Sequence, residues 1–69
     1  YKDSVKHLVE VEDCESISTT QTTDQLKALS GVCVDSGYRF LIAIPKSCSD
    51  EAKSVLALNN IAHSQLLLY

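Results

Sequence analysis

Two carboxylates, Glu10 and Glu12, stand one residue apart inside the apolar segment HLVEVED, which runs from His7 to Asp13. Alternate side chains of a β-strand point to opposite faces, so both carboxylates share one face with Leu8. Carboxylates at i and i+2 on a rigid strand can converge on one hard cation such as Mg²⁺, which prefers oxygen ligands. On a covered face the two charges resist ionisation unless a cation or donors compensate them. The pattern predicts a divalent-cation site, and the alternative is a solvated strand face.

Four further side chains have types suited to such a site. Gln25 lies beside Leu26, near the edge of a helical apolar face. Its amide can reach back toward the strand and bond a ligand, a nucleotide or a carboxylate; alternatively it is a boundary residue that bonds the backbone. Arg39 and Lys46 flank a later strand and either meet phosphate or are solvated end charges. His7 has the opposite parity from the carboxylates, which predicts a surface or packing role.

The elements that must position these groups alternate between strand and helix. A strand is expected over residues 4–12, because its content is β-branched and its polarity has period two. The polar stretch DCESISTTQTT is typical of a loop. A helix follows, with a cap at Thr22 or Thr23 and a stop at Gly37. The helical spacing gives it one apolar face, formed by Leu26, Leu29, Val32 and Cys33.

The second half repeats the alternation. The run from Phe40 to Ile44 is continuously apolar, which is typical of a strand covered on both faces. A second helix, SDEAKSVLALNN, is expected after a cap at Ser47 or Ser49, with Asp50 in its first turn. Its predicted apolar stripe is Ala52, Val55, Leu56 and Ile61. The closing SQLLLY is predicted to be a short third strand. The order is β-α-β-α-β, which indicates an α/β fold with parallel strands, right-handed crossovers and a three-layer core.

The bulk composition limits the function classes. A chain of 69 residues is one small domain with a marginal core, and the absence of Met favours a fragment of a larger domain. Apolar residues make up 45% and charged residues 22%, as in globular proteins. The net charge of −3 argues against a broadly basic surface for nucleic acid. No apolar run approaches a membrane span of roughly 20 residues.

The cysteines favour a reducing compartment. Three widely spaced residues, Cys14, Cys33 and Cys48, form no CxxC pattern and an odd number. Such a set is a poor disulfide framework, so reduced thiols and a cytoplasmic location are expected.

Taken together, HLVEVEDCESI, TTDQLKALS, YRFLIAIPKS, the EAK helix and the closing LLLY resemble the PD-(D/E)xK nuclease superfamily, the restriction-endonuclease-like fold. The resemblance covers nearly the whole chain and implies the C-terminal part of that core. By this resemblance Glu10 is the acidic metal ligand, Val11 the spacer, and Glu12 stands where the family usually has Lys. Gln25 resembles the helix Gln of some branches. The family's motif also has an Asp upstream of this strand, commonly after a Pro. Asp3 is the only candidate in this sequence, and it follows Lys2 rather than Pro. If Asp3 is not the motif residue, the motif Asp lies before this sequence.

The resemblance implies Mg²⁺- or Mn²⁺-dependent hydrolysis of DNA phosphodiesters. Glu10, and Asp3 if it is the motif residue, would hold the ion. Glu12 cannot supply the positive charge of Lys; it would bind a second ion or accept a proton from the attacking water. The alternatives are a catalytically inactive α/β module for dimerisation or partner binding, and a regulatory domain with a small-ligand site at the strand ends. A homodimer through the exposed SQLLLY edge is a further expectation.

Overall fold

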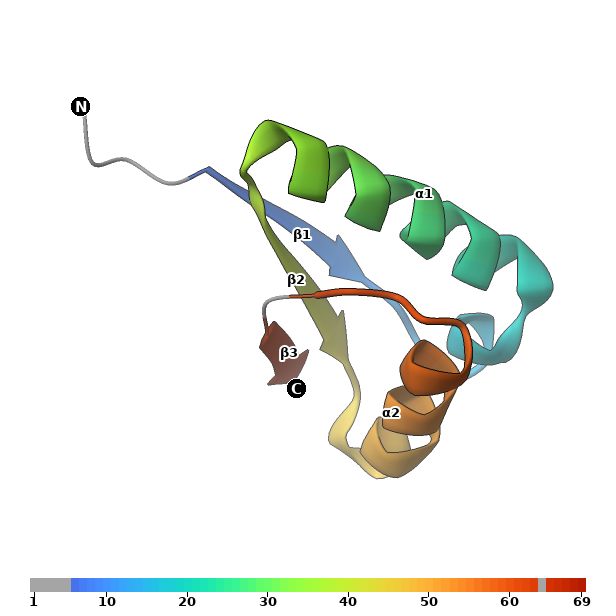
Figure 1. The fold of residues 1–69 in the computed structure, drawn as a ribbon. Coiled ribbons are helices and arrows are strands. Elements are labelled where there is room, and N and C mark those ends of the chain that lie inside the picture. The colour runs from blue at the N-terminus through green and yellow to red at the C-terminus, as the bar shows by residue number, and fades with distance from the viewer. Residues whose placement is uncertain (1–5, 64) are drawn as a thin grey trace.

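The computed structural model describes residues 6–63 and 65–69 (Figure 1). Three strands alternate with two α-helices, and a short 3₁₀ turn precedes each helix. The elements in chain order are β1 (His7–Val11), η1 (Ser16–Ser18), α1 (Thr20–Ser36), β2 (Arg39–Ile44), η2 (Lys46–Cys48), α2 (Ser49–Leu58) and β3 (Gln65–Leu68). The predicted β-α-β-α-β order is confirmed.

The three strands form a parallel sheet in the order β1-β2-β3. Glu10 pairs with Ile42 across β1 and β2, and Ile42 pairs with Leu66 across β2 and β3. Directly paired residues share a face of the sheet, so the register fixes which side chains meet the helices.

Helix α1 begins earlier than predicted. The side chain of Thr19, not Thr22 or Thr23, caps it by accepting a hydrogen bond from the Thr22 N–H. Gly37 ends the helix as predicted, with a left-handed φ of 73° that suits glycine. Leu26 and Cys33 are buried, but Val32 is 57% exposed and does not belong to the core.

Helix α2 begins without the predicted serine cap. Its N-cap is Cys48, which makes no side-chain capping bond, and Ser49 is already the first helical residue. Asp50 and Glu51 occupy the first turn, where negative charge favours the helix N-terminus. Ile61 is buried, yet it lies beyond the helix, in the segment that leads to β3.

Both helices cover the same face of the sheet (Figure 1). One cluster of buried side chains joins the two helices to alternate residues of β2. Its members include Leu26 and Cys33 of α1, Phe40, Ile42 and Ile44 of β2, and Ala52 and Leu56 of α2. The expected three-layer core is therefore wrong for the described residues, which form two layers. The physical reason is that both crossovers step in one direction across the sheet, so two right-handed connections place both helices on one side.

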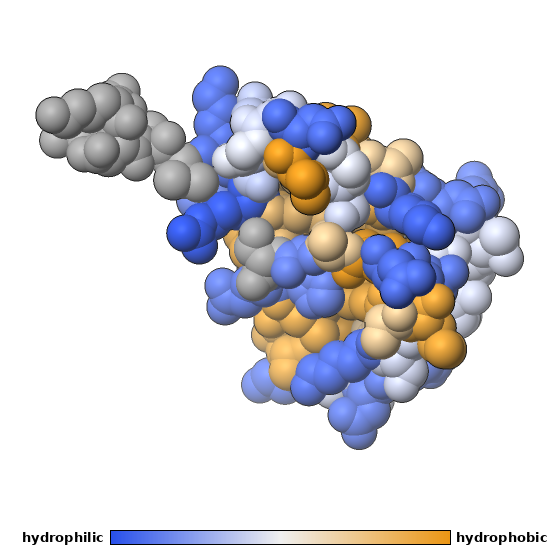
Figure 2. Space-filling view, viewed as in Figure 1, coloured by the Kyte–Doolittle hydropathy of each residue, from blue (hydrophilic) through white to orange (hydrophobic). Residues whose placement is uncertain are grey.

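The other face of the sheet has no covering layer among residues 6–63 and 65–69. Val9 is 46% exposed and Val11 65% exposed there, while Leu41 and Leu67 are half-buried. Hydrophobic surface also gathers around β3 (Figure 2). There Leu68, which pairs with the buried Ile44 and so lies on the helix-covered face, is 43% exposed. For β2 the prediction of two covered faces is met by helices on one face only; on the other face Leu41 is half-buried and Ala43 is buried without a helical layer among the described residues. Within the same residues, no helix has the length and apolar character needed to cross a bilayer.

Candidate functional site

Glu10 and Glu12 lie on the face of the sheet that the helices cover. Leu8, two residues before Glu10, packs against the core cluster, and Glu10 pairs with the buried Ile42. The strand alternation therefore turns the carboxylates toward the helical layer, where both residues are half-buried. They occupy the boundary between the core and solvent at the carboxyl end of β1.

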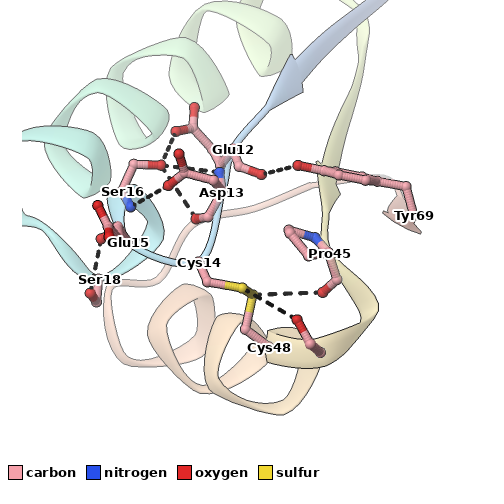
Figure 3. Close-up of a disulfide and its surroundings, with 10 residues drawn as sticks. Glu12, Asp13, Cys14, Glu15, Ser16, Ser18, Pro45, Cys48 and Tyr69 are labelled. Atoms are coloured by element: carbon pink, nitrogen blue, oxygen red, sulfur yellow. Dashed lines mark hydrogen bonds between the residues drawn. A yellow bond between two sulfur atoms is a disulfide. The ribbon is translucent and has the colours of Figure 1, made fainter.

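Glu12 is held by three hydrogen bonds. Its N–H donates to the Ala43 carbonyl at 2.9 Å, which continues the pairing with β2 beyond Val11. One carboxylate oxygen, Oε1, accepts from the Ser16 hydroxyl at 2.8 Å, and the main-chain carbonyl accepts from the Tyr69 hydroxyl at 2.8 Å. Figure 3 shows the bonds from Ser16 and Tyr69 meeting at Glu12, at the end of β1. The second carboxylate oxygen, Oε2, has no hydrogen-bond partner among the described residues.

Asp13 and Ser16 form the turn that follows Glu12. The Ser16 N–H donates to Asp13 Oδ1 at 2.7 Å, and the Asp13 N–H donates to Ser16 Oγ at 3.2 Å. Hydrogen bonds to the ionised form favour it, so the Ser16 N–H and then the Ser16 side chain lower the pKa of Asp13 below its usual 3.8. This turn directs the Ser16 hydroxyl at Glu12 and adds a third carboxylate to the same sheet edge.

A disulfide links Cys14 to Cys48 at the carboxyl end of the sheet (Figure 3). The two Cα atoms are 5.8 Å apart, and the bridge joins the loop after β1 to the turn after β2. The hydroxyl of Ser47 lies 3.6 Å from Cys14 Sγ. The prediction of three reduced cysteines is therefore wrong for this pair, while Cys33 is a free, buried thiol. The parallel strands explain the difference, because their carboxyl ends bring both cysteines to one edge.

The structure does not bring the remaining predicted residues to the carboxylates. Gln25 is exposed, and its side chain makes no hydrogen bond within the described residues. His7 is exposed on the opposite parity, as expected, and the end residues Arg39 and Lys46 are also exposed. Asp3 lies outside the described residues.

The two carboxylates suit one particular class of cation site. The described residues contain no group of three or more His, Cys, Asp or Glu side chains placed to hold a metal ion. Mg²⁺ does not need such a cage, because it commonly binds one or two protein carboxylates and completes its shell with water and phosphate oxygens. Glu10 and the open oxygen of Glu12 are carboxylate groups of the type used in that mode of binding.

Two hollows in the surface lie away from the carboxylates. One, of about 170 Å³, is lined in part by Cys33, Tyr38 and His63; the other, of about 390 Å³, in part by Lys53 and His63. Neither is lined by Glu10 or Glu12. Since every buried side-chain nitrogen and oxygen among the described residues has a hydrogen-bond partner, no buried polar group awaits a ligand in either hollow.

Comparison of the chain with protein-family models, curated proteins and solved structures found no match.

Sequence reasoning missed three features that shape the site. The Asp13–Ser16 turn has a local signal, since Asp followed three residues later by Ser commonly bonds the intervening backbone. The disulfide has a topological signal, because Cys14 and Cys48 each follow a strand of one parallel sheet. The Tyr69 contact joins residues 57 positions apart and has no local signal.

Proposed function

We propose that this chain is a nuclease-like domain that binds Mg²⁺ or Mn²⁺ through Glu10 and Glu12 and hydrolyses DNA phosphodiesters. The observation that supports the proposal is that two half-buried glutamates occupy alternate positions on the helix-covered face at the end of β1. Two negative charges at such a boundary repel each other, and a divalent cation removes that repulsion while satisfying their oxygens.

The chain's own groups divide the work as follows. Glu10 binds the ion, whose chemistry is Lewis-acid stabilisation of the charge that develops on phosphate oxygens. Ser16 fixes the orientation of the Glu12 carboxylate through Oε1. The open Oε2 is then free to share the ion or to accept a proton from the attacking water. Tyr69 and the disulfide hold the strand end and its loop in place.

Nicking of supercoiled plasmid DNA in Mg²⁺ or Mn²⁺ tests this proposal. Glu10→Gln keeps the size of the side chain but removes its charge, and we expect it to lower the nicking rate by about 100-fold or more. Asp35→Asn is the matched control, because this exposed carboxylate lies near the far end of α1. Equal nicking by the wild type and Glu10→Gln would refute the proposed role of Glu10.

The second candidate function is a catalytically inactive α/β module that binds a partner. It is favoured by the open apolar face of the sheet, where Val9 and Val11 are exposed, and by glutamate in place of the usual lysine at position 12. Absence of nicking by the wild type, together with unimpaired folding, would favour this candidate over the nuclease.

A further inference from the structure

Strand β1 forms an edge of the described sheet, and its outward backbone is free of partners there. Its pairing with β2 is closed by bonds from the Arg39 N–H to the Lys6 carbonyl at 2.8 Å and from the Glu12 N–H to the Ala43 carbonyl at 2.9 Å. In a parallel ladder, this register directs the peptide groups of even-numbered β1 residues toward β2. The outward N–H and C=O groups belong to His7, Val9 and Val11.

The described part of this edge has no proline and no bulge, and its lysine and glutamate side chains, Lys6, Glu10 and Glu12, all lie on one face of the sheet. Proteins block such edges with proline, bulges, charged side chains or a covering element, so here charge alone limits which strand can pair. Here the outward residues include two exposed valines, Val9 and Val11, and the ladder continues from Lys6 to Glu12 without interruption. A regular edge of this length is suited to addition of a further strand.

The flank of α1 on the same side is uncharged. The Ser30 hydroxyl donates to the Ala62 carbonyl at 2.6 Å, so the Ser30 side of the helix faces the segment leading to β3. Helical spacing places Leu29 and Val32 on the other flank of the helix, away from that segment. That flank consists of Thr22, Gln25, Leu29, Val32 and Ser36. The charged residues of α1, Asp24, Lys27 and Asp35, lie elsewhere on the helix.

We propose that two copies of this chain pair through antiparallel β1 edges, and that Lys6 of each copy supplies a positive charge beside Glu12 of the other. The part of the proposal that concerns the site rests on the proposed function. The dimer is a continuous six-stranded sheet with its two-fold axis at Val9. It differs from the expected homodimer, which used the SQLLLY edge.

The register follows from the charges. With the axis at Val9, Val9 of one copy lies opposite Val9 of the other, and His7 of each copy lies opposite Val11 of the other. All outward peptide groups of β1 are then paired. The same register puts Lys6 opposite Glu12 at both ends of the paired strands, where Cβ atoms are about 4.5–5.5 Å apart. Moving the axis to Val11 would set Glu10 opposite Glu12, two like charges. Of these two registers, electrostatics favours the one centred on Val9.

The side chain of Lys6 is on the correct face for this role. Alternation along the strand places it on the face that carries Leu8 and Glu12. In the single chain its ammonium lies over the Tyr38 ring, 5.7 Å from the centroid, on the β2 side, so pairing with Glu12 of a second copy requires it to leave this ring. Glu12 already uses Oε1 for Ser16, so an ammonium from the second copy meets this carboxylate at Oε2. In the dimer Oε2 therefore pairs with that ammonium, and Glu10 holds the ion. The interface thus provides, from another chain, the cation that is missing at position 12.

Charge reversal measured by sedimentation tests the dimer. We expect the wild type to form dimers at protein concentrations up to about 1 mM, because small interfaces bind weakly. Lys6→Glu and Glu12→Lys each place like charges at both ends of the interface, so each variant alone should associate at least 10-fold more weakly. An equimolar mixture of the two restores both attractive pairs and should form a heterodimer. Lys27→Glu is the matched control, because Lys27 lies on α1 outside the uncharged flank, and this variant should dimerise like the wild type.

Two results would overturn the dimer: a wild type that is monomeric at about 1 mM, or a mixture of the two variants that stays monomeric. Val9→Pro provides a second check, because it removes an outward N–H that β2 does not use. A folded Val9→Pro protein, verified by circular dichroism, should be monomeric, and wild-type association by that protein would also contradict the proposal.

The role of Lys6 in the site has a separate readout. In the mixture, the Lys6→Glu chain keeps Glu10 and Glu12 and receives Lys6 from its partner, so plasmid nicking should recover when the two variants are combined. A mixture that dimerises without recovering nicking, beside an active wild type, would refute the role of Lys6. A wild type that dimerises but neither binds Mg²⁺ nor nicks DNA would refute the proposed function and this role, and the dimer would stand.

Discussion

The Tyr69 hydroxyl donates a 2.8 Å hydrogen bond to the main-chain carbonyl of Glu12. Tyr69 follows β3 and Glu12 follows β1, so this bond crosses the end of β2 and joins the two outer strands of the sheet (Figure 3). The Tyr69 N–H also donates to the Ile44 carbonyl at 3.0 Å. One residue thereby fixes the strand end that carries the candidate carboxylates.

Removing only the Tyr69 hydroxyl should loosen this end of the sheet. We expect Tyr69→Phe to lower the free energy of unfolding by about 0.5–1 kcal/mol, because the bond is solvent-exposed. Urea denaturation followed by circular dichroism measures the change. Tyr38→Phe is the matched control, since the Tyr38 hydroxyl makes no hydrogen bond within the described residues, and an equal loss in both variants would contradict a specific role for the Tyr69 bond.

Reduction of the Cys14–Cys48 bridge should destabilise the chain substantially. The cysteines are 34 residues apart, and in the chain-entropy model closing a loop of that length stabilises the folded state by about 3–4 kcal/mol. A domain of this size has little stability to lose. Urea midpoints with and without dithiothreitol measure the effect.

The Cys14→Ala/Cys48→Ala double variant is the control for the reductant. Its urea midpoint should be insensitive to dithiothreitol and should match that of the reduced wild type. A wild type whose midpoint is unchanged by full reduction, verified by thiol titration, would show that the bridge does not stabilise the fold.

The two glycines should respond in opposite directions to alanine. Gly37 has a φ of 73°, so Gly37→Ala forces an alanine into the left-handed region and should cost about 1 kcal/mol. Gly31 lies inside α1 with nothing within 4 Å of an added Cβ, so Gly31→Ala should stabilise by about 0.5–1 kcal/mol. Thermal unfolding compares them, and a shift of the same sign in both would contradict the assigned backbone conformations.

The turn at Asp13 should make stability depend on acid pH. Ser16 lowers the pKa of Asp13 in the folded chain below its usual 3.8, so the ionised carboxylate favours folding. This contribution is present above about pH 4 and disappears as the pH falls through the lowered pKa. The stability difference between wild type and Asp13→Asn, measured from pH 7 to pH 2, should therefore shrink below pH 4. A difference that is constant across this range would contradict the assignment.

The order of elements was predictable because its signals are local. The alternation around Val9 and Val11, the apolar run of β2 and the glycine stop at Gly37 each depend on neighbouring residues. Helix starts were predicted less well. Several Ser and Thr residues precede each helix, and tertiary context selects Thr19 for α1 and no side-chain cap for α2.

The environment of the site was less predictable because it is assembled from distant segments. The strand alternation places Glu10 and Glu12 on one face, but it does not reveal that Ser16 and Tyr69 bond Glu12. The one-sided helical layer follows from the strand order 1-2-3, which a continuous apolar strand does not encode. Val32 shows the same limit, since it fits the helical apolar spacing and is nevertheless exposed.

Titration of the chain with Mn²⁺, followed by NMR, tests the metal site most directly. The paramagnetic ion should selectively broaden the amide signals of Glu10, Val11 and Glu12, and excess Mg²⁺ should reverse the broadening. Glu10→Gln should remove this effect, while Asp35→Asn should leave it unchanged. Broadening that is absent from β1, or that persists unaltered in Glu10→Gln, would contradict a cation site at the paired carboxylates.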